Sequence, residues 1–223
     1  MKAIPQPPDP ARSSGQPDKP VGEFGLLGRY RANITAGSLK LTESRVIADL
    51  LLRSLDETAW MQATVKDNLL KAKNPATAIR LARLIRQRLE TMSPELWRMV
   101  RDGTVVVATH AALAAAVKHS YLLGDFLDLA VRDQYRRFGK ALTKKLWLDF
   151  LDDCRGRDSQ MPQWHESTVR RMGSSVFQVL AQSGYIKDTR SMLLQRPPIS
   201  SEVIGYLERN KEDYVLRCIT VGT

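Results

Sequence analysis

The sequence is poor in the residues that usually carry catalysis or bind metals. It contains two cysteines, Cys154 and Cys218, and three histidines, none of which has a partner at metal-ligand spacing. Two distant cysteines inside apolar-periodic segments exclude a disulfide framework and favour buried free thiols in a reducing cytoplasm. A glycine-rich phosphate loop and a Ser/His/Asp order are also missing. We therefore expect a protein that is not an enzyme and that needs no cofactor or metal.

Long apolar runs are missing too. The most apolar segment, Val105 to Val117, is interrupted by Thr109 and His110, and a membrane-spanning helix needs about 20 apolar residues. The first ten residues, MKAIPQPPDP, lack the apolar region of a secretory signal. Hydrophobic residues make up 43% of the chain, an ordinary share for a globular protein. These features predict a cytoplasmic protein with no membrane contact.

Proline is concentrated at one end of the chain. Six of the eleven prolines lie in residues 1–24, with glycine and serine between them. Such a segment cannot bury enough apolar surface to order itself, so we predict a disordered tail over residues 1–24. Its three basic and three acidic side chains cancel, and the whole net charge of +10 therefore lies in residues 25–223.

The remainder of the chain is basic and has helical periodicity. A sequence pI of about 9.8 favours polyanionic partners, either nucleic acid or an anionic membrane surface. Over residues 25–137 we predict a helical bundle with mostly antiparallel neighbours. Thr42 is the expected N-cap of its first helix, Asn74-Pro75 is a strong helix start, and the segment from Val105 to Val117 has no polar face, as expected of a central helix. Another predicted helical stripe consists of Met61, Val65, Leu69 and Ala72.

Residues 138–223 have a different pattern. Thr143 is expected to cap a helix, a loop follows over residues 155–162, and a second helix ends at Ser183-Gly184. Two short extended segments around Asp188-Thr189 indicate a β-hairpin, and a last helix runs from about Ser201 to Arg209. Helix, turn, helix and hairpin is the order of a winged helix-turn-helix, although the loop is longer than a tight turn requires. The predicted class is thus all-α, a helical bundle with a helix-turn-helix-like or winged-helix-like C-terminal region and one short hairpin.

Basic side chains in three clusters are the candidate contacts to nucleic acid. Residues 71–88 contain six basic side chains and no acidic one, and 100° per residue places Arg80 and Arg83 opposite the apolar face. Arginine and hydroxyl groups near the start of the second helix would reach bases and phosphates. The predicted contacts are Arg80, Arg83, Arg86, Arg136, Arg137, Lys140, Lys144, Lys145, Thr168, Arg170, Arg171, Lys187 and Arg190. The alternative is that these faces are solvated and paired with acidic residues elsewhere.

Several dispersed segments resemble one protein family. They are Tyr30, 35–39 (TAGSL), 67–70 (DNLL), 78–80 (AIR), Arg88-Leu89, 123–127 (LGDFL), 147–151 (WLDFL) and 164–170 (WHESTVR). In this order they resemble the BrxA family of bacteriophage-exclusion (BREX) defence systems. The resemblance implies an all-helical bacterial protein with helix-turn-helix-like elements and a DNA-binding role among other defence proteins. An all-helical family argues against the predicted hairpin, and a partial likeness to the antitermination factor NusB leaves RNA open.

These observations predict a non-enzymatic accessory protein of phage defence. We expect it to be a monomer that contacts duplex DNA through basic helical faces with little sequence preference. Two alternatives stay open. The basic face could dock on an acidic surface of another BREX protein, or the chain could be an RNA-binding module.

Overall fold

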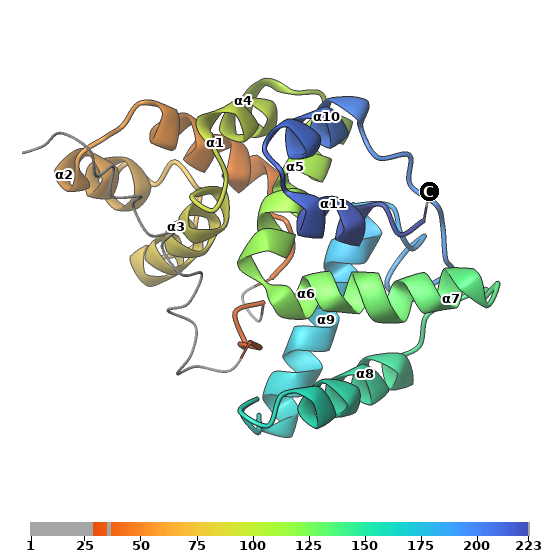
Figure 1. Cartoon of the computed structure of the whole chain (residues 1–223). Helices are drawn as coiled ribbons and strands as arrows, with labels where there is room; N and C mark the ends of the chain where they lie inside the picture. Colours follow the sequence, from red (N-terminus) through yellow and green to blue (C-terminus); the bar gives the residue numbers. More distant parts are fainter. Residues whose placement is uncertain (1–28, 35–36, 223) are drawn as a thin grey trace, which may run out of the picture.

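The computed structural model describes residues 29–34 and 37–222, and within them the protein is mainly helical without any strand (Figure 1). The predicted all-α class is confirmed, whereas the predicted tail over residues 1–24 lies outside the described residues. The elements are α1 (Leu41–Leu52), α2 (Glu57–Met61), the π-helix η1 (Gln62–Lys66), α3 (Pro75–Leu89), α4 (Pro94–Asp102), α5 (Val105–His119), α6 (Tyr121–Asp125), the π-helix η2 (Phe126–Val131), α7 (Arg132–Arg136), α8 (Lys144–Arg157), α9 (Glu166–Gln182), α10 (Ser201–Arg209) and α11 (Asp213–Ile219).

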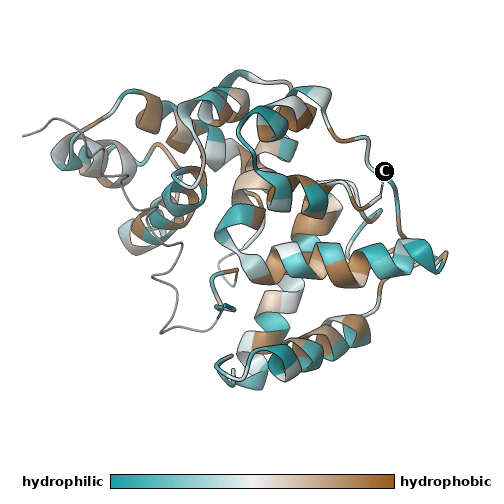
Figure 2. Ribbon diagram, in the orientation of Figure 1, coloured by the Kyte–Doolittle hydropathy of each residue, from teal (hydrophilic) through white to brown (hydrophobic). Residues whose placement is uncertain are grey.

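Helices α1, α3, α4 and α5 pack on one another and form the first part of the core. The predicted start of α3 is confirmed, because the Asn74 side chain accepts a hydrogen bond from the Thr77 amide at 2.8 Å and Pro75 follows it. Helix α5 is buried on almost every side, as its apolar sequence predicts. In Figure 2 the outward faces of the helices around it carry more of the hydrophilic colour.

The second part of the core surrounds the helical segment formed by α6, η2 and α7. Phe126 on η2 makes edge contacts with Trp147, Phe150 and Phe177, with ring centroids 5.2–6.1 Å apart. Trp147 also donates a hydrogen bond from its indole nitrogen to the Val169 carbonyl at 3.1 Å, which ties α8 to α9. A Cβ on Gly173 would lie 2.8 Å from the Trp147 ring, so only glycine allows the two helices to approach this closely.

The C-terminal helices α10 and α11 return to the first part of the chain. Helix α10 packs on α4 and α5, while α11 packs on α5, α6 and η2. Asp128 accepts hydrogen bonds from both Arg132 and Arg217, which joins η2 to α11. One apolar core thus contains residues of both predicted regions, and the division at residues 137 and 138 stays a prediction.

Several predicted helix boundaries are wrong. Helix α1 begins at Leu41 after a left-handed Lys40, and Thr42 is not its cap. Met61 and Leu69 are 38% and 44% exposed, since α2 passes into η1 and the helix ends at Lys66 before the expected stripe is complete. Helix α8 continues to Arg157 and α9 begins at Glu166, so the loop lies at 158–165 and is shifted from the predicted 155–162 segment.

The predicted hairpin is reduced to two isolated antiparallel bridges, Ile186 with Leu194 and Ala141 with Leu193. Asp188 closes the turn by accepting hydrogen bonds from the Arg190 and Ser191 amides. Met192 then takes a left-handed conformation with φ 51°, which interrupts the extended chain and stops the pairing. The winged-helix assignment therefore stays a prediction.

The described helices were also compared with the length and apolarity of a membrane span. No single described helix meets both requirements. The helical segments Val105–His119 and Tyr121–Arg136 meet both requirements only when taken together, and the chain bends by 108° between them.

Candidate nucleic-acid interface

The outward face of α3 carries two uncompensated arginines. Arg80 and Arg83 are exposed, as predicted from the helical periodicity, and neither forms an ion pair within the described ranges. Arg86 behaves differently. It is half-buried, pairs with Glu90 at 2.7 Å and with Glu57 at 3.7 Å, and stacks over the Trp60 ring. Arg80 and Arg83 are therefore free to meet an external anion, while Arg86 is already engaged by α2.

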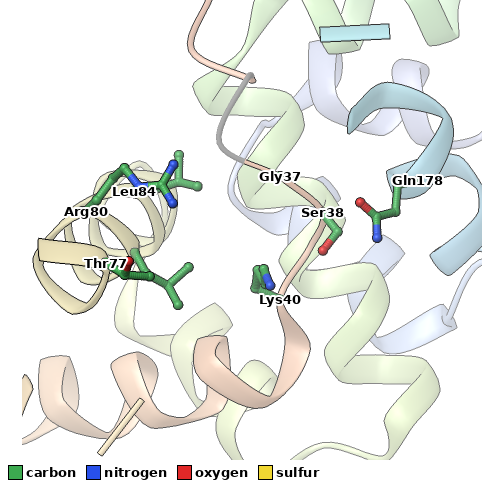
Figure 3. A pocket seen from close by; sticks show the side chains of 8 residues that line it. Gly37, Ser38, Lys40, Thr77, Arg80, Leu84 and Gln178 are labelled. Atoms are coloured by element: carbon green, nitrogen blue, oxygen red, sulfur yellow. The ribbon is translucent and has the colours of Figure 1, made fainter. Parts of the chain in front are cut away.

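A pocket of about 240 Å³ joins α3 to α9 across the segment 37–40 (Figure 3). Figure 3 shows Thr77, Arg80 and Leu84 on α3, with Gln178 on the opposite side. The full lining is Gly37, Ser38, Lys40, Thr77, Arg80, Leu81, Leu84 and Gln178. Cationic, hydroxyl and amide groups of this kind are the usual hydrogen-bond donors to phosphate oxygens.

Buried Arg88 holds the wall of this pocket in place. Its guanidinium donates hydrogen bonds to the Ser38 carbonyl at 2.9 Å and to the Gly37 carbonyl at 3.3 Å. Burial lowers the pKa of Arg88 to about 10. The side-chain amide oxygen of Gln182 fixes the same segment by accepting a hydrogen bond from the Leu39 amide. Nothing local in the sequence signals that Arg88 bonds to residues 37 and 38.

Helix α9 extends this surface away from the pocket. Arg171, Ser174 and Gln178 are exposed at helical spacing, and about 10 Å separates the first from the last along the axis. Arg170 is also exposed but lies 3.6 Å from Glu166, and Thr168 is half-buried in the first turn. We call Lys40, Arg80, Arg83, Arg171 and Gln178 the α3–α9 surface.

A second basic group gathers around the two β-bridges. The Lys140 carbonyl accepts a hydrogen bond from the Leu194 amide, and the Lys187 amide donates one to the Leu193 carbonyl, so three separate segments lie side by side. We call Arg136, Lys140, Lys144, Lys187 and Arg190 the bridge surface. All five are exposed, and no ion pair involves them in the part of the chain that the structure describes. Figure 1 shows that α7 ends on the side of the molecule away from α3.

The remaining predicted contacts are engaged in helical ion pairs. Arg137 pairs with Asp133 at 2.9 Å, and Lys145 pairs with Asp149 at 2.7 Å, both at i, i+4 spacing. Surface pairs of this type are worth only about 0.3–0.5 kcal/mol. A phosphate could therefore displace them at small cost, but they weaken the local positive field.

Comparison with known proteins decides the family. The model of the BrxA family matches residues 28–211. The chain belongs to the BrxA family. It is 51% identical over 194 residues to the BREX protein BrxA of Paramagnetospirillum magneticum, covering 87% of this chain and 98% of the relative. It is 32% identical to the BREX protein BrxA of Escherichia coli O9:H4 over 189 residues, covering 83% of this chain and 89% of that relative.

A solved structure supports the same relationship. The crystal structure of an uncharacterized protein from Magnetospirillum magneticum aligns with a TM-score of 0.81 and 49% identity. The alignment covers 86% of this chain and 99% of that one. The fold of this BrxA-family chain is thus shared with an experimentally determined protein of similar sequence.

Two of the segments that carry the family resemblance meet at a buried carboxylate. Asp125 accepts hydrogen bonds from the Arg29 guanidinium, from the Tyr30 hydroxyl at 2.8 Å and from the Tyr214 hydroxyl at 2.7 Å. A Cβ on Gly124 would collide with the Tyr214 hydroxyl. Burial and the neighbouring carboxylate raise the pKa of Tyr30. This network ties residues 29 and 30 to α6 and α11.

His110 and the two cysteines of this BrxA-family chain are held in structural positions. His110 is buried and its Nδ1 atom accepts a hydrogen bond from the Ser200 amide at 3.1 Å. Cys154 and Cys218 are buried free thiols, as predicted, and burial raises the pKa of Cys218 to about 12. A neutral buried thiol is a poor nucleophile. Among the described residues, no three His, Cys, Asp or Glu side chains are arranged to hold a metal ion.

Proposed function

We propose that this chain is a non-enzymatic DNA-binding accessory protein of a bacterial BREX phage-defence system. The observation that carries the proposal is the α3–α9 surface, where exposed Arg80 and Arg83 have no acidic partner in the described part of the chain. Two arginines at i, i+3 on one helix repel each other by a few tenths of a kcal/mol. A row of phosphates converts this repulsion into attraction.

The shape of the α3–α9 surface favours a duplex over a small anion. The pocket presents cationic, hydroxyl and amide donors at one end, and Arg171 continues the surface along α9. Helix α9 has seventeen residues, and its one exposed face is long enough to follow a major groove. Only Arg171 among its exposed, unpaired side chains is a common reader of guanine, so binding through the backbone should dominate and sequence preference should be low.

The experiment is a salt titration of the purified protein with an unrelated duplex of about two helical turns. Phosphate contacts release counterions, so the logarithm of the binding constant should fall linearly with the logarithm of salt concentration. An affinity that does not change between low and high salt would contradict this mechanism. No binding even at low salt would remove duplex DNA as a partner of the isolated chain.

The same purified protein also distinguishes the two alternative classes of partner, RNA and another BREX protein. If structured RNA displaces the duplex at equal concentration, the chain is an RNA-binding module rather than a DNA-binding one. If neither nucleic acid binds, the basic surfaces serve to dock an acidic face of another BREX protein. Sedimentation of the free chain also tests the expectation that it is a monomer.

A further inference from the structure

Phe138 combines two unfavourable features at one position. Its side chain is 87% exposed, the largest exposed fraction among the exposed large hydrophobic side chains of the described chain. Its backbone is left-handed, with φ 55°. The Phe138 and Gly139 amides donate to the Tyr135 and Gln134 carbonyls and close the end of α7, an arrangement in which the left-handed position is usually glycine. A phenylalanine here adds conformational cost and gains little burial.

The residues next to Phe138 are held in place by packing and hydrogen bonds. Tyr135 is buried, its hydroxyl donates a hydrogen bond to the Gln195 carbonyl, and the Arg196 guanidinium lies over its ring at 5.4 Å. Phe138 borders an open recess of about 350 Å³ whose other lining residues are Tyr135, Gly139, Leu194, Gln195 and Arg196. Figure 1 shows that the chain leaves α7 at the edge of the molecule. The aromatic ring is therefore presented outward from an ordered support.

The surroundings of Phe138 are cationic. Arg136 and Lys140 of the bridge surface lie within two residues of it, and Arg196 lies on the wall of the recess. The nearest acidic side chain in sequence, Asp133, is paired with Arg137. An apolar anchor for a protein partner usually lies in a patch depleted of charge. An apolar side chain with an unpaired cation on each side of it in the sequence, Arg136 and Lys140, instead fits a ligand that has apolar base stacks behind a phosphate surface.

We propose that Phe138 is a wedge that enters between adjacent base pairs of duplex DNA while the bridge surface binds the flanking phosphates. Phenylalanine and other large apolar residues partly unstack a base step in this way and bend the duplex by roughly 20–90°. The inference rests on the proposed duplex binding and adds a second contact, separate from the α3–α9 surface, that deforms the DNA.

The test measures DNA bending and DNA binding separately. A duplex of about three helical turns carries a donor and an acceptor dye at its two ends, so that bending raises energy transfer. Saturation with the wild-type protein should raise energy transfer. Phe138→Ala should bind with an unchanged salt dependence, since every cation is retained, but should lose the rise in energy transfer. Phe138→Leu should still show the rise in energy transfer, because leucine also serves as an apolar wedge.

Leu148→Ala is the matched control, since Leu148 on α8 is 48% exposed and lies outside the bridge surface. It should bend the duplex as the wild type does. Wild-type binding without bending would overturn the wedge and leave the proposed function intact, as would equal bending by wild type and Phe138→Ala. Absence of bending with Phe138→Leu would also overturn the wedge. Absence of duplex binding by the wild type would instead overturn the proposed function.

Discussion

Arg80 on α3 and Gln178 on α9 line the same pocket, although their helices lie in different predicted regions of the chain. The segment 37–40 lies between them and is fixed by the hydrogen bonds of buried Arg88. Arg80, the one arginine of the first region's cluster that lines this pocket, therefore lies next to the exposed face of α9. A ligand that reaches one of them is within reach of the other.

Charge reversal on α3 should weaken duplex binding without unfolding the protein. The double variant Arg80→Glu, Arg83→Glu places two carboxylates where we propose phosphate contacts, and the slope of the salt dependence should fall by about two. Both side chains point away from the core, so the urea midpoint should stay within the small range of surface substitutions. Binding isotherms at several salt concentrations and a urea titration provide the two measurements.

The matched control for this charge reversal is Arg98→Glu with Lys211→Glu. Both residues are exposed and lie outside the α3–α9 surface and the bridge surface. The two double variants carry the same net charge, so a general loss of positive charge would weaken both equally. Equal weakening would contradict a specific contact at Arg80 and Arg83, and a large loss of stability would show that these side chains are not turned outward.

The contact between α8 and α9 predicts opposite effects for two glycine substitutions. Gly173→Ala places a Cβ 2.8 Å from the Trp147 ring, and relief of this overlap should lower the free energy of unfolding by about 1–3 kcal/mol. Gly156→Ala in α8 meets no atom within 4 Å and should raise it by about 0.5 kcal/mol through helix propensity. Urea denaturation of both variants tests the pair. Similar stabilities would contradict the close packing of Trp147 on α9.

Burial of His119 predicts a loss of stability in mild acid. Desolvation, together with the charges of Arg88 and Arg31, lowers the pKa of His119 to about 4. The unfolded chain binds a proton near pH 6.5, whereas the folded chain does so only near pH 4. The unfolded state therefore binds more protons in this window, and stability falls as the pH is lowered from 6.5 to 4.

Replacement of His119 isolates this contribution. His119→Gln cannot titrate, so its urea midpoint should fall less between pH 7.5 and pH 4.5 than that of the wild type. The comparison is made within each protein, which removes any constant effect of the substitution on packing. Parallel losses in the two proteins would rule His119 out as a source of the acid sensitivity.

The left-handed conformation of Phe138 makes a further prediction about stability. Phe138→Gly should raise the free energy of unfolding by about 0.5–1 kcal/mol, because glycine adopts positive φ without a steric penalty. Phe138→Ala keeps the Cβ and should stay close to the wild type. A glycine variant that is less stable than the alanine variant would contradict a strained backbone at this position.

Local signals in the sequence predicted several helix ends correctly. Asn74 with Pro75, and Thr143, act through hydrogen bonds to amides three residues away, and Ser183-Gly184 stops α9 with a left-handed glycine at φ 82°. These interactions lie within one turn, so the residue types alone specify them. The prediction of a helical stripe from Met61 to Ala72 was wrong, because apolar residues continue at helical spacing beyond Lys66, where η1 ends.

The sequence by itself determined the helical class, the buried course of α5 and the gathering of unneutralised positive charge beyond the first 24 residues. Tertiary structure alone decided which cations are free. Arg86 is paired, Arg88 is buried, and Arg80 remains available beside Gln178. The physical reason is the sequence distance over which each kind of interaction acts. Helix ends depend on hydrogen bonds within three or four residues, whereas the pairing or burial of a long cationic side chain depends on segments that meet only when the core has packed.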